Sequence, residues 1–147
     1  MRLTRFTDFA LRVLIYLGLR PGEWVTIRCI SDAYGISRNH LMKVVSQLTR
    51  AGYLVAQRGP GGGIQLARPP GEINLGDVIR DTEEDLVMVE CFSEDGQCVI
   101  TPACRLKKVI GQALDAYLDT VQHFTLADLI EPTDALAEIL HIPPEAA

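Results

Sequence analysis

The chain has 147 residues, of which 48% are hydrophobic and 22% are charged, and it contains four cysteines. This apolar content excludes a disordered chain, the length allows one main hydrophobic core, and no apolar run approaches the roughly 20 residues that span a membrane. Four cysteines are too few for a disulfide scaffold, and no secretory signal is expected because Arg12 interrupts the first apolar stretch.

The net charge of −5 conceals a division of the chain into two oppositely charged parts. Residues 1–70 contain ten Lys or Arg and three Asp or Glu, a balance of +7, whereas residues 71–147 contain four and sixteen, a balance of −12. Such a separation indicates that the first part meets a polyanion and that the second part has another role. The alternative is two solvated faces that segregate without a functional reason.

Residues 1–70 are predicted to form a winged helix-turn-helix DNA-binding module. Apolar residues at helical spacing predict a first helix from Thr7, its expected N-cap, to Arg20. Thr26 and Ser37 are expected to cap two shorter helices. Two short helices joined by a tight turn behind a longer one make a helix-turn-helix.

A β-hairpin wing is expected to follow these helices. The β-prone runs 53–57 and 64–67 flank a segment, 58–63, with four glycines. The fold class is therefore mainly α with a small β-hairpin wing and a long C-terminal dimerisation helix. The remaining regions are a connecting helix at 75–82 with an acidic linker (within 71–90), a cysteine loop (91–104), the dimerisation helix (102–123) and a tail with short helices (124–147).

DNA contacts are expected on the third helix, on the wing and near the N-terminus. Phosphates require cations, and the N-terminal residues of a recognition helix meet base edges. The wing glycines allow close approach along the minor groove. The expected contacts are Arg2, Ser37, Arg38, Asn39, His40, Lys43, Arg58, Gly59, Gly61 and Gly62. Gln47 and Arg50 belong either to this surface or to a solvated helix face.

Three cysteines, Cys91, Cys98 and Cys104, fall within fourteen positions. Thiolates bind iron–sulfur clusters or zinc, and Cys104 is expected in the first turn of a helix that starts at Thr101-Pro102, where the helix dipole favours thiolate. Three ligands leave one coordination position of a metal centre open. The spacing is therefore compatible with an iron–sulfur cluster, a three-cysteine zinc site or a disulfide-forming redox switch. Cys29, on the second helix, is interpreted as a small buried hydrophobic residue.

The helix predicted from Thr101-Pro102 carries an apolar stripe along its length. The stripe lies beyond the compact module, so a partner helix is its expected cover, and burial against the module itself is the alternative. Its members are Leu106, Val109, Ile110, Ala113, Leu114, Tyr117, Leu118 and Val121. Two short helices are expected in the tail, near 126–130 and 134–140.

Several of these motifs resemble one known family. Residues 1–12 (MRLTRFTDFALR), 40–45 (HLMKVV), 58–63 (RGPGGG) and the three-cysteine loop are similar to the NsrR/IscR family of winged-helix regulators, and the likeness covers roughly residues 1–130. The resemblance implies a cytoplasmic bacterial homodimer that binds double-stranded DNA at an inverted-repeat operator.

The resemblance also implies a ligand set for the cluster. In NsrR-like members the fourth ligand is an aspartate near the start of the first helix of the partner subunit, and Asp8 stands at the matching position. If the resemblance is set aside, Asp8 is interpreted as a carboxylate in the first turn that complements the helix dipole. IscR-like members use a histidine three residues after the third cysteine to hold a 2Fe–2S cluster, and this chain has Lys107 there. The likeness therefore favours a 4Fe–4S cluster over a 2Fe–2S cluster.

The function that follows is a DNA-binding repressor that senses nitric oxide and releases DNA when its cluster is nitrosylated. One alternative is a regulator of the same family that senses iron–sulfur status or redox state. Another is a zinc-stabilised DNA-binding protein. An enzyme is not expected, because the sequence offers no nucleophile–base pair and no phosphate loop that opens a helix after a strand.

Overall fold

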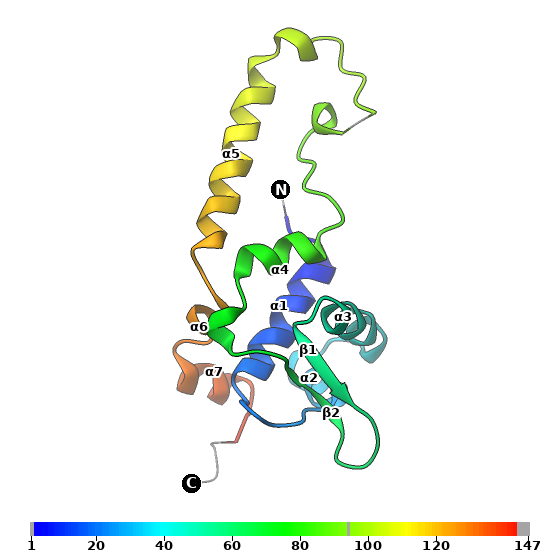
Figure 1. Ribbon diagram of the computed structural model, residues 1–147, viewed down its shortest axis with the longest axis vertical. Helices are drawn as coiled ribbons and strands as arrows, with labels where there is room; N and C mark the ends of the chain where they lie inside the picture. The colour runs from blue at the N-terminus through cyan, green and yellow to red at the C-terminus, as the bar shows by residue number, and fades with distance from the viewer. Residues whose placement is uncertain (1, 94, 144–147) are drawn as a thin grey trace.

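Three helices and a two-stranded hairpin form the N-terminal part of the computed structural model, which describes residues 2–93 and 95–143 (Figure 1). Strands β1 and β2 pair antiparallel, with Leu54 opposite Leu66 and Gln57 opposite Gly63. These elements, called the winged module below, are α1 (Arg5–Gly18), α2 (Ile27–Tyr34), α3 (Arg38–Arg50), β1 (Leu54–Gln57) and β2 (Gly63–Leu66). The predicted winged helix-turn-helix is confirmed.

The helix starts of the winged module follow local capping chemistry. The hydroxyls of Thr26 and Ser37 accept the backbone N–H groups of Cys29 and His40, each at 3.3 Å, as predicted. The predicted N-cap of α1 is wrong. Thr4, three residues earlier, accepts the N–H of Thr7 at 3.2 Å, and Thr7 is buried. The helix gains this turn because Phe6 already packs against the core.

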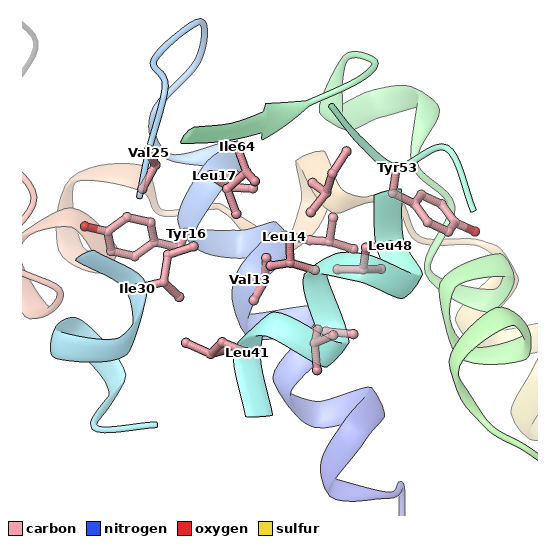
Figure 2. Close-up of a cluster of buried hydrophobic side chains, with 14 of the residues drawn as sticks. Val13, Leu14, Tyr16, Leu17, Val25, Ile30, Leu41, Leu48, Tyr53 and Ile64 are labelled. Carbon is pink, nitrogen blue, oxygen red and sulfur yellow. The ribbon is translucent and has the colours of Figure 1, made fainter. Parts of the chain in front are cut away.

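α1 lies at the centre of the core (Figure 2). Val13 and Leu14 are fully buried and Leu17 is 2% exposed. The facing stripe of α3 is the one predicted, and it consists of Leu41, Val44, Val45 and Leu48. Each such side chain contributes about 1.5–3 kcal/mol when it leaves water, so this helix pair carries much of the stability of the module.

The hairpin is joined to the core through the connection between α1 and α2. Val25 and Ile64 exchange backbone hydrogen bonds of 3.0 and 2.8 Å. A Cβ on Gly63 would lie 2.6 Å from the Val25 carbonyl oxygen, so the close approach requires glycine. At the tip, Gly59 and Gly61 have φ of 96° and 74°, which strains other residues. The orientation of the wing is thus set by backbone contacts.

Beyond the hairpin, α4 (Leu75–Thr82) leads into an arm, residues 83–122, that extends away from the module (Figure 1). The arm contains short 3₁₀ turns at Glu90–Phe92 and Thr101–Ala103 and the long helix α5 (Arg105–Gln122), which has no buried residue. The predicted helix start at Thr101-Pro102 is wrong. Cys104 is extended, with ψ of 111°, and this ends the 3₁₀ turn and makes Cys104 the N-cap of α5.

The tail returns to the winged module. Helices α6 (Leu126–Leu129) and α7 (Thr133–Ile139) lie where short helices were predicted. Leu126, Leu140 and Ile142 are buried in the same core as α1, so the tail helps to cover that helix. No described helix is long and apolar enough to cross a membrane.

Candidate nucleic-acid interface and cysteine loop

The outer face of α3 presents the predicted contact residues to solvent. Arg38, Asn39, His40 and Lys43 are exposed, while the opposite stripe of the helix is buried. Ser37 is also exposed, but its hydroxyl already caps the helix, so this oxygen has one acceptor site committed. The first turn of α3 contains no acidic residue that would repel phosphate.

In the wing, the side chain of Arg58 is next to glycines whose backbone is accessible. Arg58, Gly59 and Gly61 are exposed, and in the described part of the chain no residue other than the immediate neighbours comes within 4 Å of the position of a Cβ on either glycine. Gly62 is half-buried, and a Cβ there would lie 2.3 Å from the carbonyl oxygen of Gln57. Its observed role is to close the turn. Arg2, the remaining predicted contact, is exposed next to α1.

Gln47 has a role that the sequence interpretation did not consider. Its side chain is half-buried and donates a 2.7 Å hydrogen bond to the backbone carbonyl of Asp81, at the end of α4. Arg50, by contrast, is exposed. Gln47 and Asp81 lie 34 positions apart, and no local pattern in the sequence indicates such a contact.

Asp8 lies on the surface of α1 in an ion pair with Arg12. The Arg12 guanidinium lies 2.9 Å from one carboxylate oxygen and donates from Nε to the other at 3.2 Å; the Asp8 side chain stays 45% exposed. Arg12 also lies over the rings of Phe9 and Tyr34, at 6.0 and 5.8 Å from the ring centres. Burial raises the pKa of Tyr34 to about 12, against the opposing effect of Arg12. The i, i+4 spacing of Asp8 and Arg12 is a signal that sequence reading missed.

Cys91, Cys98 and Cys104 are free and half-buried in the arm. The loop turns back on itself, since a Cβ on Gly96 would lie 2.4 Å from the Glu90 carbonyl oxygen and 3.2 Å from the Cα of Cys91. Within the described residues of this single chain, no three His, Cys, Asp or Glu side chains lie close enough to hold a metal ion. Three thiols suit iron–sulfur or zinc chemistry.

The interpretation of Cys29 as a buried residue is wrong. Its side chain is exposed, with the sulfur 3.2 Å from the Thr26 hydroxyl oxygen. α2 is a short helix whose only buried residue is Ile30, and the neighbouring position turns away from the core.

The predicted dimerisation stripe on α5 is only partly covered by the rest of the chain. Leu114 and Tyr117 are half-buried and line a pocket with Thr4, whereas the start of the stripe is exposed. Leu106 and Val109 are 60% and 57% exposed, and no residue of the helix is buried. Next to the helix, Val99 and Ile100 are 91% and 61% exposed.

Comparisons with known proteins identify the family of the chain. The chain matches the Rrf2 family, described as iron-dependent transcriptional regulator, over residues 3–132. It is 47% identical over 142 residues to the HTH-type transcriptional regulator NsrR of Bacillus licheniformis, which covers 95% of this chain and 99% of the relative. NsrR of Bacillus subtilis is also 47% identical, with coverage of 95% and 97%. The predicted resemblance is thereby confirmed.

A solved structure shares the fold. CymR, the global cysteine regulator of B. subtilis, has a TM-score of 0.72 and 27% identity, with 88% of this chain and 95% of that chain covered. The chain therefore resembles both a global cysteine regulator and the NsrR relatives. The signal that is sensed has to be argued from the residues of the arm and not from the fold.

Proposed function

The chain belongs to the Rrf2 family, as a transcriptional regulator of the IscR/NsrR type, and we propose that it is a DNA-binding repressor that carries an iron–sulfur cluster and senses nitric oxide. The observation that carries this is the set of three half-buried thiols on an arm that projects from a winged helix-turn-helix. The resemblance to NsrR-like proteins supplies the signal, nitric oxide, and the 4Fe–4S type.

The arm would hold the cluster through Cys91, Cys98 and Cys104, and Asp8 of the partner subunit would supply the fourth ligand. Asp8 is accessible for this, because its side chain is 45% exposed and, among the described residues, its carboxylate is bound by Arg12 of its own helix alone. When bound, the cluster supplies the iron with which nitric oxide reacts. The homodimer would join its two arms through the exposed apolar face of α5, and its two α3 helices would bind the half-sites of an inverted repeat.

Anaerobic purification followed by a visible spectrum with iron and sulfide quantitation tests the cofactor. We expect iron and sulfide in the wild-type protein, their loss in Cys98→Ala, and their retention in the matched control Cys29→Ala, whose thiol is exposed on α2. Zinc without visible absorbance would end the cluster assignment and favour the zinc-stabilised alternative.

Titration with nitric oxide, and separately with oxygen and chelator, tests the signal. DNA release at stoichiometric nitric oxide supports a nitric-oxide sensor, whereas release only after chelation or oxidation favours the alternative of a sensor of iron–sulfur status. That alternative is favoured by the description of the matched family as iron-dependent.

The role of Asp8 has a matched control in the same module. Asp32 pairs with Arg28 at 3.6 Å and i, i+4 spacing, as Asp8 pairs with Arg12, and it is 67% exposed. We expect Asp8→Ala to alter the nitric oxide response and Asp32→Ala to leave it unchanged. If Asp8→Ala protein keeps its cluster and releases DNA as wild type does, Asp8 has no part in the switch.

A further inference from the structure

Helix α4 lies between the arm and the winged module (Figure 1). Its N-cap residue and two residues within the helix are hydrogen-bonded to the end of α5. The side chain of Asn74 donates to the Gln122 carbonyl at 2.7 Å, and the side chain of Gln122 donates to Asp77 at 3.2 Å. Arg80 donates to the side-chain oxygen of Gln122. The last residue of α5 is therefore held from one side by three residues of the α4 region.

Gly76 makes this contact sterically possible. A Cβ at this position would lie 2.5 Å from the side-chain oxygen of Gln122 and 3.2 Å from that of Asn74. A larger residue would displace the flexible Gln122 side chain without disturbing backbone. A substitution of Gly76 should therefore disrupt the contact between α4 and Gln122 without a change to Gln122 itself.

The last turn of α4 is bound to two parts of the winged module at once. The Asp81 carboxylate accepts a hydrogen bond from the Tyr53 hydroxyl at 2.6 Å, and its carbonyl accepts the Gln47 amide at 2.7 Å. Tyr53 is 2% exposed at the base of β1, and Arg68 lies 4.8 Å above its ring. Burial and the Asp81 carboxylate both raise the pKa of Tyr53, so its hydroxyl remains a donor. Asp81 therefore joins α3 to the root of the wing.

Glu83, directly after α4, binds a third part of the module. Its carboxylate accepts the N–H of Thr4 at 2.8 Å and the Thr4 hydroxyl at 3.1 Å. Thr4 is the N-cap of α1. The body of α4 is anchored as well, since Val78 and Ile79 are 1% and 2% exposed. A short helix with a buried face and polar contacts at both ends moves as a unit.

We propose that Asp81 and Gln122 are positioning residues for DNA binding, which act through α4 to fix α3 and the wing relative to α5. This role rests on the DNA-binding function proposed above. A dimer that joins two α5 helices can hold its recognition helices at one separation only if each module is rigidly attached to its own arm. The contacts of α4 are this attachment.

The test uses full-length protein and a duplex that the wild-type chain itself selects from a randomised pool. Tyr53→Phe removes the hydrogen bond to Asp81, Gln122→Ala removes the side-chain bonds to Asp77 and Arg80, and Gly76→Ala displaces the same Gln122 side chain. Tyr34→Phe is the control, since the Tyr34 hydroxyl makes no hydrogen bond to a residue that the structure describes. We expect each of the three to weaken binding of the selected duplex about fivefold to tenfold, the effect of one hydrogen bond. Binding of a scrambled duplex and the control should change by less than about twofold.

A double variant separates positioning from general loss of stability. Tyr53 and Gln122 have no hydrogen-bond partner in common among the described residues, so independent effects on binding would multiply. If α4 transmits position, Tyr53→Phe combined with Gln122→Ala should bind within about twofold of the weaker single variant. Multiplied effects, or unchanged binding by Gln122→Ala, would overturn the assignment.

Amide hydrogen exchange of the free protein tests the attachment through α4 separately from the proposed DNA binding. Gln122 is exposed and far along the chain from the hairpin, yet Gln122→Ala should speed exchange in β1 and the last turn of α3, as Tyr53→Phe does. Faster exchange in a chain that selects no duplex would support α4 as the attachment and refute DNA binding. Exchange in β1 that Gln122→Ala leaves unchanged would refute the attachment.

Discussion

The winged module and the arm use the same kind of apolar stripe in opposite ways. In the module, the stripe of α1 meets α3, the wing and the tail, and Val13 and Leu14 are fully buried. In the arm, α5 has a comparable stripe, yet Leu106 and Val109 stay more than half exposed and no residue of the helix is buried. The module therefore completes its fold within one chain, while the apolar face of the arm stays partly exposed, and we propose that a second copy of the chain covers it.

The largest expected difference concerns stability. Leu14→Ala should lower the free energy of unfolding by about 2–5 kcal/mol, because it leaves a cavity in the core. Leu106→Ala, in the arm, should cost less than about 1 kcal/mol at protein concentrations that keep the chain monomeric. Urea unfolding measures both. Equal losses would mean that the arm shares the core of the module.

The second prediction concerns assembly. Leu106→Asp together with Val109→Asp should weaken dimerisation at least about 100-fold, because two carboxylates would be buried without partners. The module should remain folded. Sedimentation gives the dissociation constant, and Ile139→Asp on α7, where the side chain is 71% exposed, is the control. A double variant as dimeric as wild type would show that α5 is not the interface.

Substitutions of glycine should change the stability of the module and of the arm by smaller amounts and in opposite directions. Gly63→Ala should destabilise the module by roughly 1–3 kcal/mol, because its Cβ would press on the Val25 backbone. The Cβ of Gly111→Ala, in the middle of α5, would make an ordinary contact with the Phe92 ring at 3.9 Å and meet no closer atom of the described residues outside its own helix. It should stabilise that helix by about 1 kcal/mol. Thermal unfolding followed by circular dichroism distinguishes the two signs, and the same sign for both would contradict the structure.

The smallest effect is a pH dependence confined to the module. The folded pKa of Tyr34 is raised to about 12 from its ordinary 10 by burial. Its contribution to stability is therefore complete below pH 10 and is lost as the pH rises through 12. The difference between tyrosinate titrations of wild type and Tyr34→Phe isolates this group. A midpoint near 10 would mean that Tyr34 is solvated.

Local patterns in the sequence determined most elements of the fold and the residue types of the candidate site. Caps at Thr26 and Ser37, the stripe of α3, the glycine hairpin and the cysteine spacing all depend on neighbours within a few residues. The same reasoning was wrong about the start of α5. One helix was expected to begin at Thr101-Pro102, but a 3₁₀ turn occupies Thr101–Ala103 and α5 begins only after Cys104.

Only the tertiary structure decided how the two parts of the chain are joined. The bonds of Asp81 to Tyr53 and Gln47, and of Glu83 to Thr4, connect residues 28, 34 and 79 positions apart. Periodicity and capping report which face of an element is apolar and where that element ends. They carry no information about which polar side chains meet once the elements pack, because those partners are selected by the shape of the whole core.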